Sequence, residues 1–259
     1  GSASMMGAAQ IAAKAALRCS AGLVTLAAPR RVTRTLTSSI PEAVMFPLKM
    51  GESGAISSRE AKRIVEHANS MSAIAAGCGM SWCEDTRKVI ETVIREVEIP
   101  LVLDADALNV ISEYPEILHT RKAPTILTPH PGEMARLCSK TISEVQADRI
   151  GAALSFSKQY GVITVLKGAY TVIATNDGRV YFNETGNSGL SRGGSGDMVT
   201  GIMGALLAQG IPAEKAAVSG VYLHGLSADL CAQKMSQYAM LATDVIESLS
   251  DAFLQIKGR

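Results

Sequence analysis

Short apolar runs alternate with helical segments along most of this chain, and this alternation constrains the fold more than any other feature of the sequence. The runs that we expect to be strands span residues 23–27, 44–48, 73–76, 100–103, 125–127 and 162–166. Strands that alternate with helices are typical of βαβ units around a largely parallel sheet. The runs have no period-two pattern, as expected where helices cover both faces of a sheet. We therefore predict an α/β fold, a three-layer sandwich with a mostly parallel central sheet and helices on both faces.

Helices and one hairpin complete this prediction. Ser57 and Glu60 have the spacing of a capping box for a helix that runs to about residue 68. Further helices are expected at about 84–98, 142–160, 195–209, 212–233 and 242–256. Asn176-Asp177-Gly178 predicts a hairpin between strands 171–174 and 180–183.

No repeat or linker divides the chain, so we expect one domain over residues 1–259. The chain opens on a loop rich in glycine and serine, and such loops normally follow a strand. We therefore expect a first strand to be missing before Gly1, unless Gly1-Ser2 is a cloning remnant.

Composition argues against several classes of partner. The net charge is +1, aromatic residues make up 4% of the chain, and no long basic run is present, so nucleic acid and an anionic membrane surface are not expected partners. No apolar run approaches the roughly 18 residues of a membrane span. The five cysteines are scattered and odd in number, which favours reduced thiols in a cytoplasmic protein. Cys78 and Cys83 lack a second pair or a nearby histidine, so a zinc site is not expected.

The glycine-rich segment 186–197 points most clearly to chemistry. Its glycines let a ligand approach the backbone closely, and an apolar helix follows from about Ser195. Such a loop at a helix N-terminus offers free N–H groups and the positive end of the helix dipole, which suit a phosphate. Asp197 would repel that phosphate, so its presence makes sense as a base that takes a proton from the attacking group. The alternative is a glycine-rich turn before a core helix, with Asp197 as a partner of the helix dipole.

Polar motifs also follow several predicted strands. Together with the glycine-rich segment they are Gly77-Cys78-Gly79, residues 104–109, residues 128–133, Lys167-Gly168 and residues 193–197. Because ligands bind at the carboxyl ends of strands in open α/β sheets, these motifs predict one crevice. Each is weak alone, since loops at strand ends also carry glycine and aspartate for turns.

Single side chains in these motifs each have two interpretations. His130 lies between two prolines that stiffen its backbone, which suits a substrate contact, although a surface histidine in a turn is slightly favoured. Lys167 is either a phosphate or ribose contact or a solvated lysine. Asp104 and Asp106 either hold Mg²⁺ through water or cap the helix that begins near residue 107. His224 lies in an apolar helix, where we expect a hydrogen-bonded core histidine.

The order of the motifs resembles one family. Gly193-Gly194-Ser195-Gly196-Asp197 resembles the anion-hole and base motif of the ribokinase-like superfamily. Segments 4–9, 77–79, 103–109, 127–133, 166–171 and 186–201, taken together, resemble the ADP/ATP-dependent NAD(P)H-hydrate dehydratases. Segments 128–133 and 186–197 are the most specific, and the resemblance covers essentially the whole chain. It implies a ribokinase-like fold.

The resemblance also implies an enzyme that repairs hydrated NADH or NADPH. With ADP or ATP and Mg²⁺, it would phosphorylate the ring hydroxyl, and phosphate would then leave to restore the dihydronicotinamide. Asp197 would take the proton of the hydroxyl, and backbone N–H groups of an anion hole would hold the phosphate; these belong to Gly193, Gly194, Ser195 and Gly196. The nucleotide would contact Lys167, Gly168, Ala169, Tyr170, Thr171 and Gly196, and the hydrated cofactor would contact Ala8, Gly79, His130 and Asp197. A homo-oligomer, with a tetramer as one candidate form, is a further implication, and the metal ligands stay open.

The sequence departs from the family pattern at Ser188, Ser191 and Ser195, where we expect proline, an alanine-like residue and threonine, and at Cys78, where proline is usual. These differences concern the stiffness of the loops. A small-molecule kinase of the same fold, acting on a vitamin precursor or sugar, would share Asp197 but release a phosphorylated product. A non-catalytic nucleotide-binding protein would not need a base beside the phosphate. An NAD-linked dehydrogenase is least favoured, because no Gly-x-Gly-x-x-Gly follows a first strand with an acid about 20 residues on.

Overall fold

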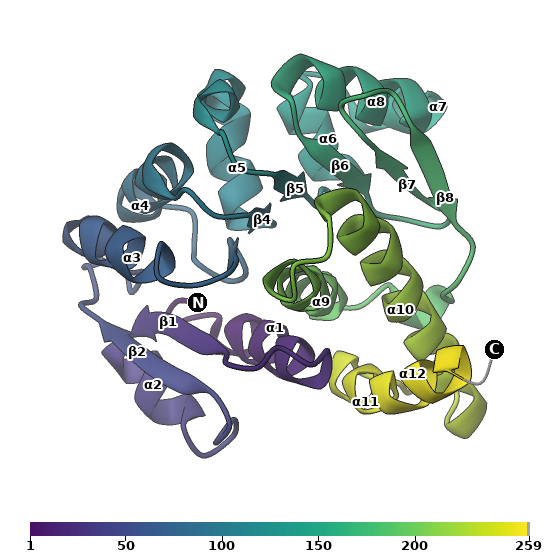
Figure 1. Ribbon diagram of the computed structural model, residues 1–259, viewed down its shortest axis with the longest axis horizontal. Helices are drawn as coiled ribbons and strands as arrows, with labels where there is room; N and C mark the ends of the chain where they lie inside the picture. The colour runs from purple at the N-terminus through teal and green to yellow at the C-terminus, as the bar shows by residue number, and fades with distance from the viewer. Residues whose placement is uncertain (258–259) are drawn as a thin grey trace.

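The central sheet of the computed structural model, which describes residues 1–257, has six strands (Figure 1). In spatial order they are β3 (Ile74–Ala76), β4 (Leu101–Leu103), β5 (Thr125–Leu127), β6 (Ile163–Leu166), β7 (Thr171–Ala174) and β8 (Val180–Asn183). Strands β3 to β6 are parallel, and β7 and β8 add two antiparallel strands. The predicted hairpin is confirmed, and its turn uses the positive φ of +101° that Gly178 can adopt.

Helices cover both faces of this sheet. Successive strand residues point to opposite sides, and because they are apolar, both faces have to be buried. Leu101 and Leu103 belong to one apolar core and Val102 to the other. The first core is covered by α3 (Ala61–Ala68), α4 (Glu84–Glu96), α5 (Asp106–Glu113), α6 (Pro131–Leu137), α7 (Ile142–Ala147) and α8 (Arg149–Tyr160). The second core is covered by α1 (Met6–Arg18), α9 (Ser195–Ala208), α10 (Ala213–Lys234), α11 (Ala242–Glu247) and α12 (Leu249–Lys257). The predicted three-layer α/β sandwich is therefore confirmed.

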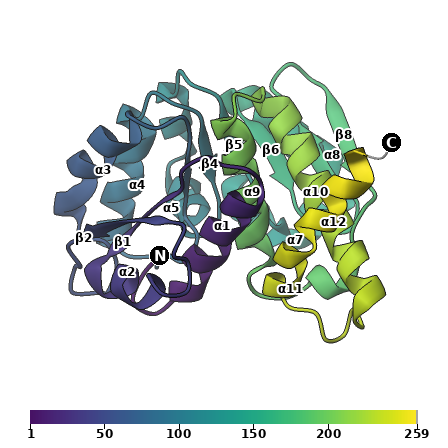
Figure 2. The ribbon, with the colours of Figure 1, turned by 60° about the horizontal axis from the view of Figure 1, so that its bottom comes forward.

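A separate two-stranded sheet lies near the N-terminus, next to α1 (Figure 2). Its strands β1 (Thr25–Pro29) and β2 (Val44–Leu48) are parallel, and the connection between them contains α2 (Arg30–Leu36). Val32 and Leu36 of α2 pack against β1 in a third apolar core. Strand β1 begins two residues later than the sequence predicted, whereas β2 has the predicted bounds.

Two helices that the sequence predicts as continuous are divided. Asp148 separates α7 from α8: its backbone φ is −142°, and its side chain accepts a hydrogen bond from the N–H of Gly151 at 2.7 Å. Because Asp148 caps α8, the predicted helix 142–160 is two helices. The predicted helix 242–256 likewise consists of α11 and α12, which meet at Ser248.

The predicted capping box at Ser57 is wrong. Ser57 makes no side-chain cap, and residues 58–60 form a 3₁₀ turn before α3. The N–H of Ser58 donates to Asp85 at 2.8 Å, and Glu60 pairs with Arg63 at 3.0 Å. Contacts with α4 and within α3 therefore replace the local cap.

The helices α1, α9 and α10 pack closely on one face of the sheet. A Cβ atom on Gly201 of α9 would overlap the carbonyl oxygen of Ala12 in α1, so the close approach of these helices requires glycine. Helix α10 has 22 residues, but neither it nor any other helix within residues 1–257 is long and apolar enough to cross a bilayer.

His224 of α10 lies against the backbone of Ser195, at the start of α9. Its Nε2 atom is buried without a hydrogen-bond partner among residues 1–257, so the prediction of a fully hydrogen-bonded histidine is wrong for this atom. Burial, together with the positive charge of Lys167, lowers the pKa of His224 to about 4 from the ordinary 6.5. The imidazole is therefore neutral at pH 7, directly behind the N-terminus of α9.

The low pKa of His224 predicts a pH-dependent stability. As pH falls below 6.5, the imidazole of the unfolded chain binds a proton, whereas the folded one does so only near a pKa of about 4. The stabilisation is therefore complete above about pH 6.5 and is lost between there and pH 4. Between pH 7 and pH 5, we expect the unfolding free energy of the wild type to fall by about 2 kcal/mol more than that of His224→Asn, measured by urea denaturation. His119→Asn, a change at an exposed histidine, should follow the wild type; equal slopes in all three proteins would contradict this prediction.

Candidate active site

The loops after the parallel strands are tied to one another at the carboxyl edge of the sheet. The backbone N–H of Asp104 donates to Ala76 at 3.1 Å, that of Thr128 to Leu103 at 3.1 Å, and that of Lys167 to Pro129 at 2.8 Å. The start of α9 lies at the same place, because a Cβ atom on Gly196 would be 3.2 Å from the Nζ of Lys167. The structure therefore brings the polar motifs after β3, β4, β5 and β6 together at the N-terminus of α9.

A buried ion pair lies at the centre of this arrangement. Asp104 is 1% exposed and accepts hydrogen bonds from the Nζ of Lys167 at 2.6 Å and the hydroxyl of Thr200 at 2.9 Å. Glu133 lies 3.9 Å from the same Nζ. Burial disfavours the charge of Lys167, but these two carboxylates outweigh it and raise the pKa of the ammonium group. Asp104 therefore neither caps a helix nor offers a free carboxylate, and Lys167 is not a solvated lysine.

Asp197 lies in the first turn of α9, half-buried beside Cys78. Burial raises the pKa of Asp197, although its hydrogen bond with the Cys78 thiol acts in the opposite direction. Burial also raises the pKa of Cys78 well above its ordinary value, so this side chain stays a thiol and can donate to the carboxylate. A carboxylate with a raised pKa holds a proton more strongly, which is the property that a general base needs.

The predicted anion hole is the N-terminus of α9. Gly194 is the N-cap residue with a φ of +96°, and no side chain caps the helix. Within residues 1–257, the N–H of Ser195 makes only a long hydrogen bond of 3.4 Å with the carbonyl oxygen of Arg192. The first N–H groups of a helix have no partner within it, so those of Ser195, Gly196 and Asp197 are available to an anion. Gly193 is exposed, with no heavy atom within 4 Å of the place that a Cβ would take.

The sequence did not identify the metal ligands, and one group of residues in the structure could be a metal site. The Sγ of Cys78 and carboxylate oxygens of Asp104 and Asp197 lie within 4.8 Å of one another. Mg²⁺ takes oxygen ligands and keeps several waters, whereas a thiol suits softer metals. Asp104 is also occupied by Lys167 and Thr200. These residues therefore do not form a protein cage for Mg²⁺.

The predicted nucleotide loop, residues 167–171, is held by Arg149, which sequence reasoning missed. The guanidinium donates to the carbonyl oxygens of Leu166 at 3.0 Å, Lys167 at 3.4 Å and Ala169. The loop then turns through Gly168 and the exposed Tyr170, which both have positive φ. Arg149 is the first residue of α8. Predicting the helix break at Asp148 would have placed Arg149 at a helix N-terminus and so drawn attention to it.

Two of the predicted substrate contacts, Ala8 and Gly79, touch each other. Gly79 has a φ of +60°, and a Cβ atom there would be 2.8 Å from the Cβ of Ala8 and 2.7 Å from the carbonyl oxygen of Met5. Only glycine fits this position, so the loop after β3 lies directly on the first turn of α1.

His130, the third predicted substrate contact, caps α6 and shares no hydrogen bond with Ala8 or Gly79 in the described part of the chain. Its Nδ1 accepts from the N–H groups of Gly132 and Glu133, and Glu133 accepts from the N–H of His130 at 2.7 Å. Burial and the charge of Lys167 lower the pKa of His130, which keeps the ring neutral. Glu133 belongs to the predicted motif 128–133, but its role as the partner of His130 was missed, although its spacing from His130 is that of a capping box.

This chain is similar to known proteins in both sequence and fold. A family model described as NAD(P)H-hydrate dehydratase matches residues 1–251. The bifunctional NAD(P)H-hydrate repair enzyme Nnr of Moorella thermoacetica is 40% identical over 249 residues, which cover 96% of this chain and 47% of that protein. This chain spans about half the length of the curated relatives that it matches first.

Comparison with solved structures leads to the same family and gives the fold. The ADP/ATP-dependent NAD(P)H-hydrate dehydratase of Bacillus subtilis, co-crystallised with ATP and Mg²⁺ and soaked with CoA, has a TM-score of 0.83 at 31% identity, over 98% of this chain and 89% of that one. A ribokinase-like superfamily protein of Enterococcus faecalis has a TM-score of 0.80 at 23% identity, over 95% of this chain and 82% of that one. The chain therefore has the ribokinase-like fold and belongs to the NAD(P)H-hydrate dehydratase family.

Proposed function

We propose that this chain dehydrates hydrated NADH or NADPH, with ADP or ATP as phosphoryl donor. The observation that carries the proposal is Asp197, a half-buried carboxylate of raised pKa beside the open N-terminus of α9. A site that only binds a nucleotide gains nothing from an acid there, because the acid repels the phosphate. Family membership supports the substrate, and the Bacillus subtilis relative is named as ADP/ATP-dependent.

In the proposed reaction, the ring hydroxyl of the hydrate attacks the terminal phosphorus of the nucleotide. Asp197 takes the hydroxyl proton as the new O–P bond forms and the bond to the nucleotide breaks. The N–H groups of Gly193, Gly194, Ser195 and Gly196 hold the transferring phosphoryl group. The ring nitrogen then expels phosphate, a neighbouring ring carbon loses a proton, and the dihydronicotinamide double bond is restored.

The remaining residues position the two substrates. Lys167, Gly168, Ala169, Tyr170 and Thr171 form the loop assigned to the nucleotide, and Arg149 fixes the carbonyl groups of that loop. Ala8 and Gly79 form the contact assigned to the hydrated cofactor, together with His130 in the loop after β5. Because Cys78, Asp104 and Asp197 do not form a cage for Mg²⁺, the ion is expected to enter on the nucleotide phosphates, where it would neutralise their charge. The scattered, odd-numbered cysteines support a cytoplasmic location, and the family resemblance adds a homo-oligomer, such as a tetramer, as an expectation.

The direct test follows the absorbance of reduced nicotinamide in a mixture of hydrated NADH, Mg²⁺ and either ADP or ATP. We expect the absorbance to rise only when one of the nucleotides is present, which would also identify the donor. A stable phosphorylated product without this rise would instead support a small-molecule kinase of the same fold.

Replacing Asp197 by Asn should remove the base while keeping the shape of the site. We expect kcat in the same assay to fall by about 10²- to 10⁴-fold, with the nucleotide dissociation constant changed by less than about three-fold. Asp177→Asn, the same substitution at the β7–β8 turn, should leave both values unchanged. Turnover at the wild-type level in Asp197→Asn would remove this residue as the base.

Arg149→Met should act on nucleotide binding rather than on chemistry, because Arg149 holds the carbonyl groups of the nucleotide loop. We expect the KM for the nucleotide to rise about ten-fold while kcat stays within about two-fold. Lys158→Met, at an exposed position of the same helix, is the matched control and should behave as the wild type. A fall in kcat with an unchanged nucleotide KM would show that Arg149 does not position this loop.

A further inference from the structure

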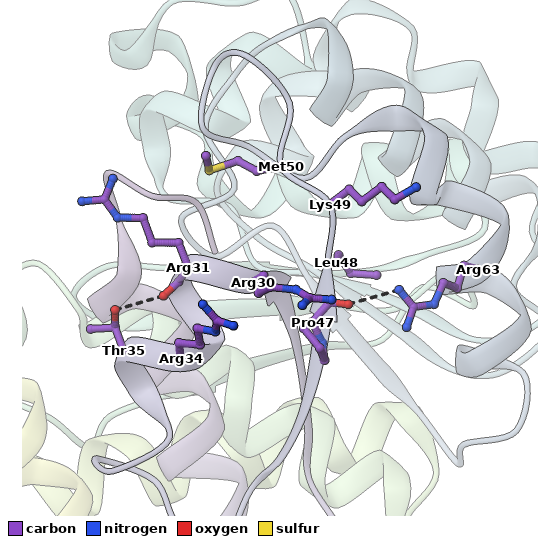
Figure 3. Close-up of a pocket in the computed structure, with 9 residues that line it drawn as sticks. All are labelled: Arg30, Arg31, Arg34, Thr35, Pro47, Leu48, Lys49, Met50 and Arg63. Carbon is purple, nitrogen blue, oxygen red and sulfur yellow. Dashed lines mark hydrogen bonds between the residues drawn. The ribbon is translucent and has the colours of Figure 1, made fainter.

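A cavity of about 760 Å³ opens at the carboxyl ends of β1 and β2, in the small sheet (Figure 3). Five cationic side chains line it: Arg30, Arg31, Arg34, Lys49 and Arg63. No carboxylate is among its lining residues. The chain as a whole has a net charge of +1, so this concentration of positive charge is a local feature of the molecule.

Three of these cations come from one short helix. Helix α2 turns Val32 and Leu36 into the third apolar core, which leaves Arg30, Arg31 and Arg34 exposed on its other side. Arg30 and Arg34 are four residues apart, and Arg31 and Arg34 are three apart, so the three charges are neighbours on the helix surface and repel one another. None of the three, nor Lys49, forms an ion pair with a carboxylate within residues 1–257.

Arg63 differs from the other four because it is fixed. It pairs with Glu60 at 3.0 Å, donates to the carbonyl oxygen of Pro47 at 3.1 Å, and lies 4.4 Å above the ring of Phe46. In Figure 3, Arg30 and Arg34 extend toward Pro47 from the side of α2, while Arg63 reaches it from the opposite side. Arg63 is therefore a held guanidinium, whereas Arg30 and Arg34 approach Pro47 without an ion-pair partner within residues 1–257.

We propose that this cavity binds the pyrophosphate group of a nucleotide. Guanidinium groups bind phosphate oxygens through paired, charge-assisted hydrogen bonds, and an anion with several charges would relieve the repulsion within α2. Ligands of α/β folds bind at the carboxyl ends of parallel strands, which is where this cavity opens. Its volume lies within the range of small-molecule sites, about 300–1,000 Å³.

Two molecules could bring that pyrophosphate. Residues 51–56 follow the lining residue Met50 along the chain and contact the segments that carry the proposed substrate contacts Ala8 and Gly79: Gly54 accepts from the N–H of Ala3 at 2.9 Å, and Ser53 donates to the Sγ of Cys83 at 3.3 Å. The pyrophosphate is therefore either that of the hydrated dinucleotide itself or that of a separate nucleotide. The first source, the hydrated dinucleotide, rests on the proposed function, whereas the separate nucleotide does not.

The test is calorimetric titration with inorganic pyrophosphate at low salt and without magnesium. We expect the double variant Arg30→Ala/Arg34→Ala to bind pyrophosphate at the cavity at least about ten-fold more weakly than the wild type. The variant Lys122→Ala/Lys140→Ala removes the same charge from two exposed positions elsewhere and should titrate as the wild type. Thermal unfolding of all three proteins checks that the folds are intact. Identical pyrophosphate titrations in the arginine variant, the lysine variant and the wild type would overturn the proposal.

Kinetics of the same variants separate the two sources. A raised KM for hydrated NADH in the arginine variant, with kcat kept, assigns the cavity to the substrate. An unchanged KM together with the lost pyrophosphate affinity assigns it to a separate nucleotide. The titration needs no turnover, so a protein that fails to dehydrate the hydrate still tests the cavity.

Discussion

The buried ion pair between Asp104 and Lys167 is the interaction on which the arrangement of the site depends. It joins the loop after β4 to the loop after β6, and Thr200 ties the same carboxylate to α9. Such a pair adds little net stability, because desolvation of both charges offsets their attraction. Removing one partner is costly, about 3–5 kcal/mol, because the other charge is left buried alone. The pair therefore acts as a positional constraint: these loops and α9 cannot separate without leaving an unpaired charge.

This ion pair limits how much of the positive charge of Lys167 is available to a ligand. Its ammonium group is already compensated by Asp104 and Glu133. A phosphate at the start of α9 would consequently be held mainly by backbone N–H groups, with Lys167 as a nearby, fixed charge. Asp197 lies beside such a phosphate, and burial raises its pKa. In the proposed reaction, the same burial makes Asp197 a better proton acceptor.

The sequence predicted best what is encoded locally. Strands β2, β5, β7 and β8 have their predicted bounds, because apolar runs between turn residues define them. The prediction failed where a distant contact or a single polar residue determines the local structure. Asp148 breaks a helix whose apolar pattern continues on both sides, and Ser58 bonds to Asp85 of another helix. The pair Asp104–Lys167 spans 63 positions, so only the folded chain could show which acid meets which base. The motif positions predicted their convergence, but not their partners.

The two phosphate sites that we propose work in different ways, and the difference fits their tasks. At α9 the donors are backbone N–H groups, fixed before the ligand arrives, which is what a transferring phosphoryl group requires because reorganisation would raise the barrier. At the small sheet the donors are mostly unpaired guanidinium groups on flexible side chains, with Arg63 alone held in place. Flexible donors lose entropy when they bind, so they suit retention of a ligand rather than catalysis. The small sheet therefore has the character of a docking site.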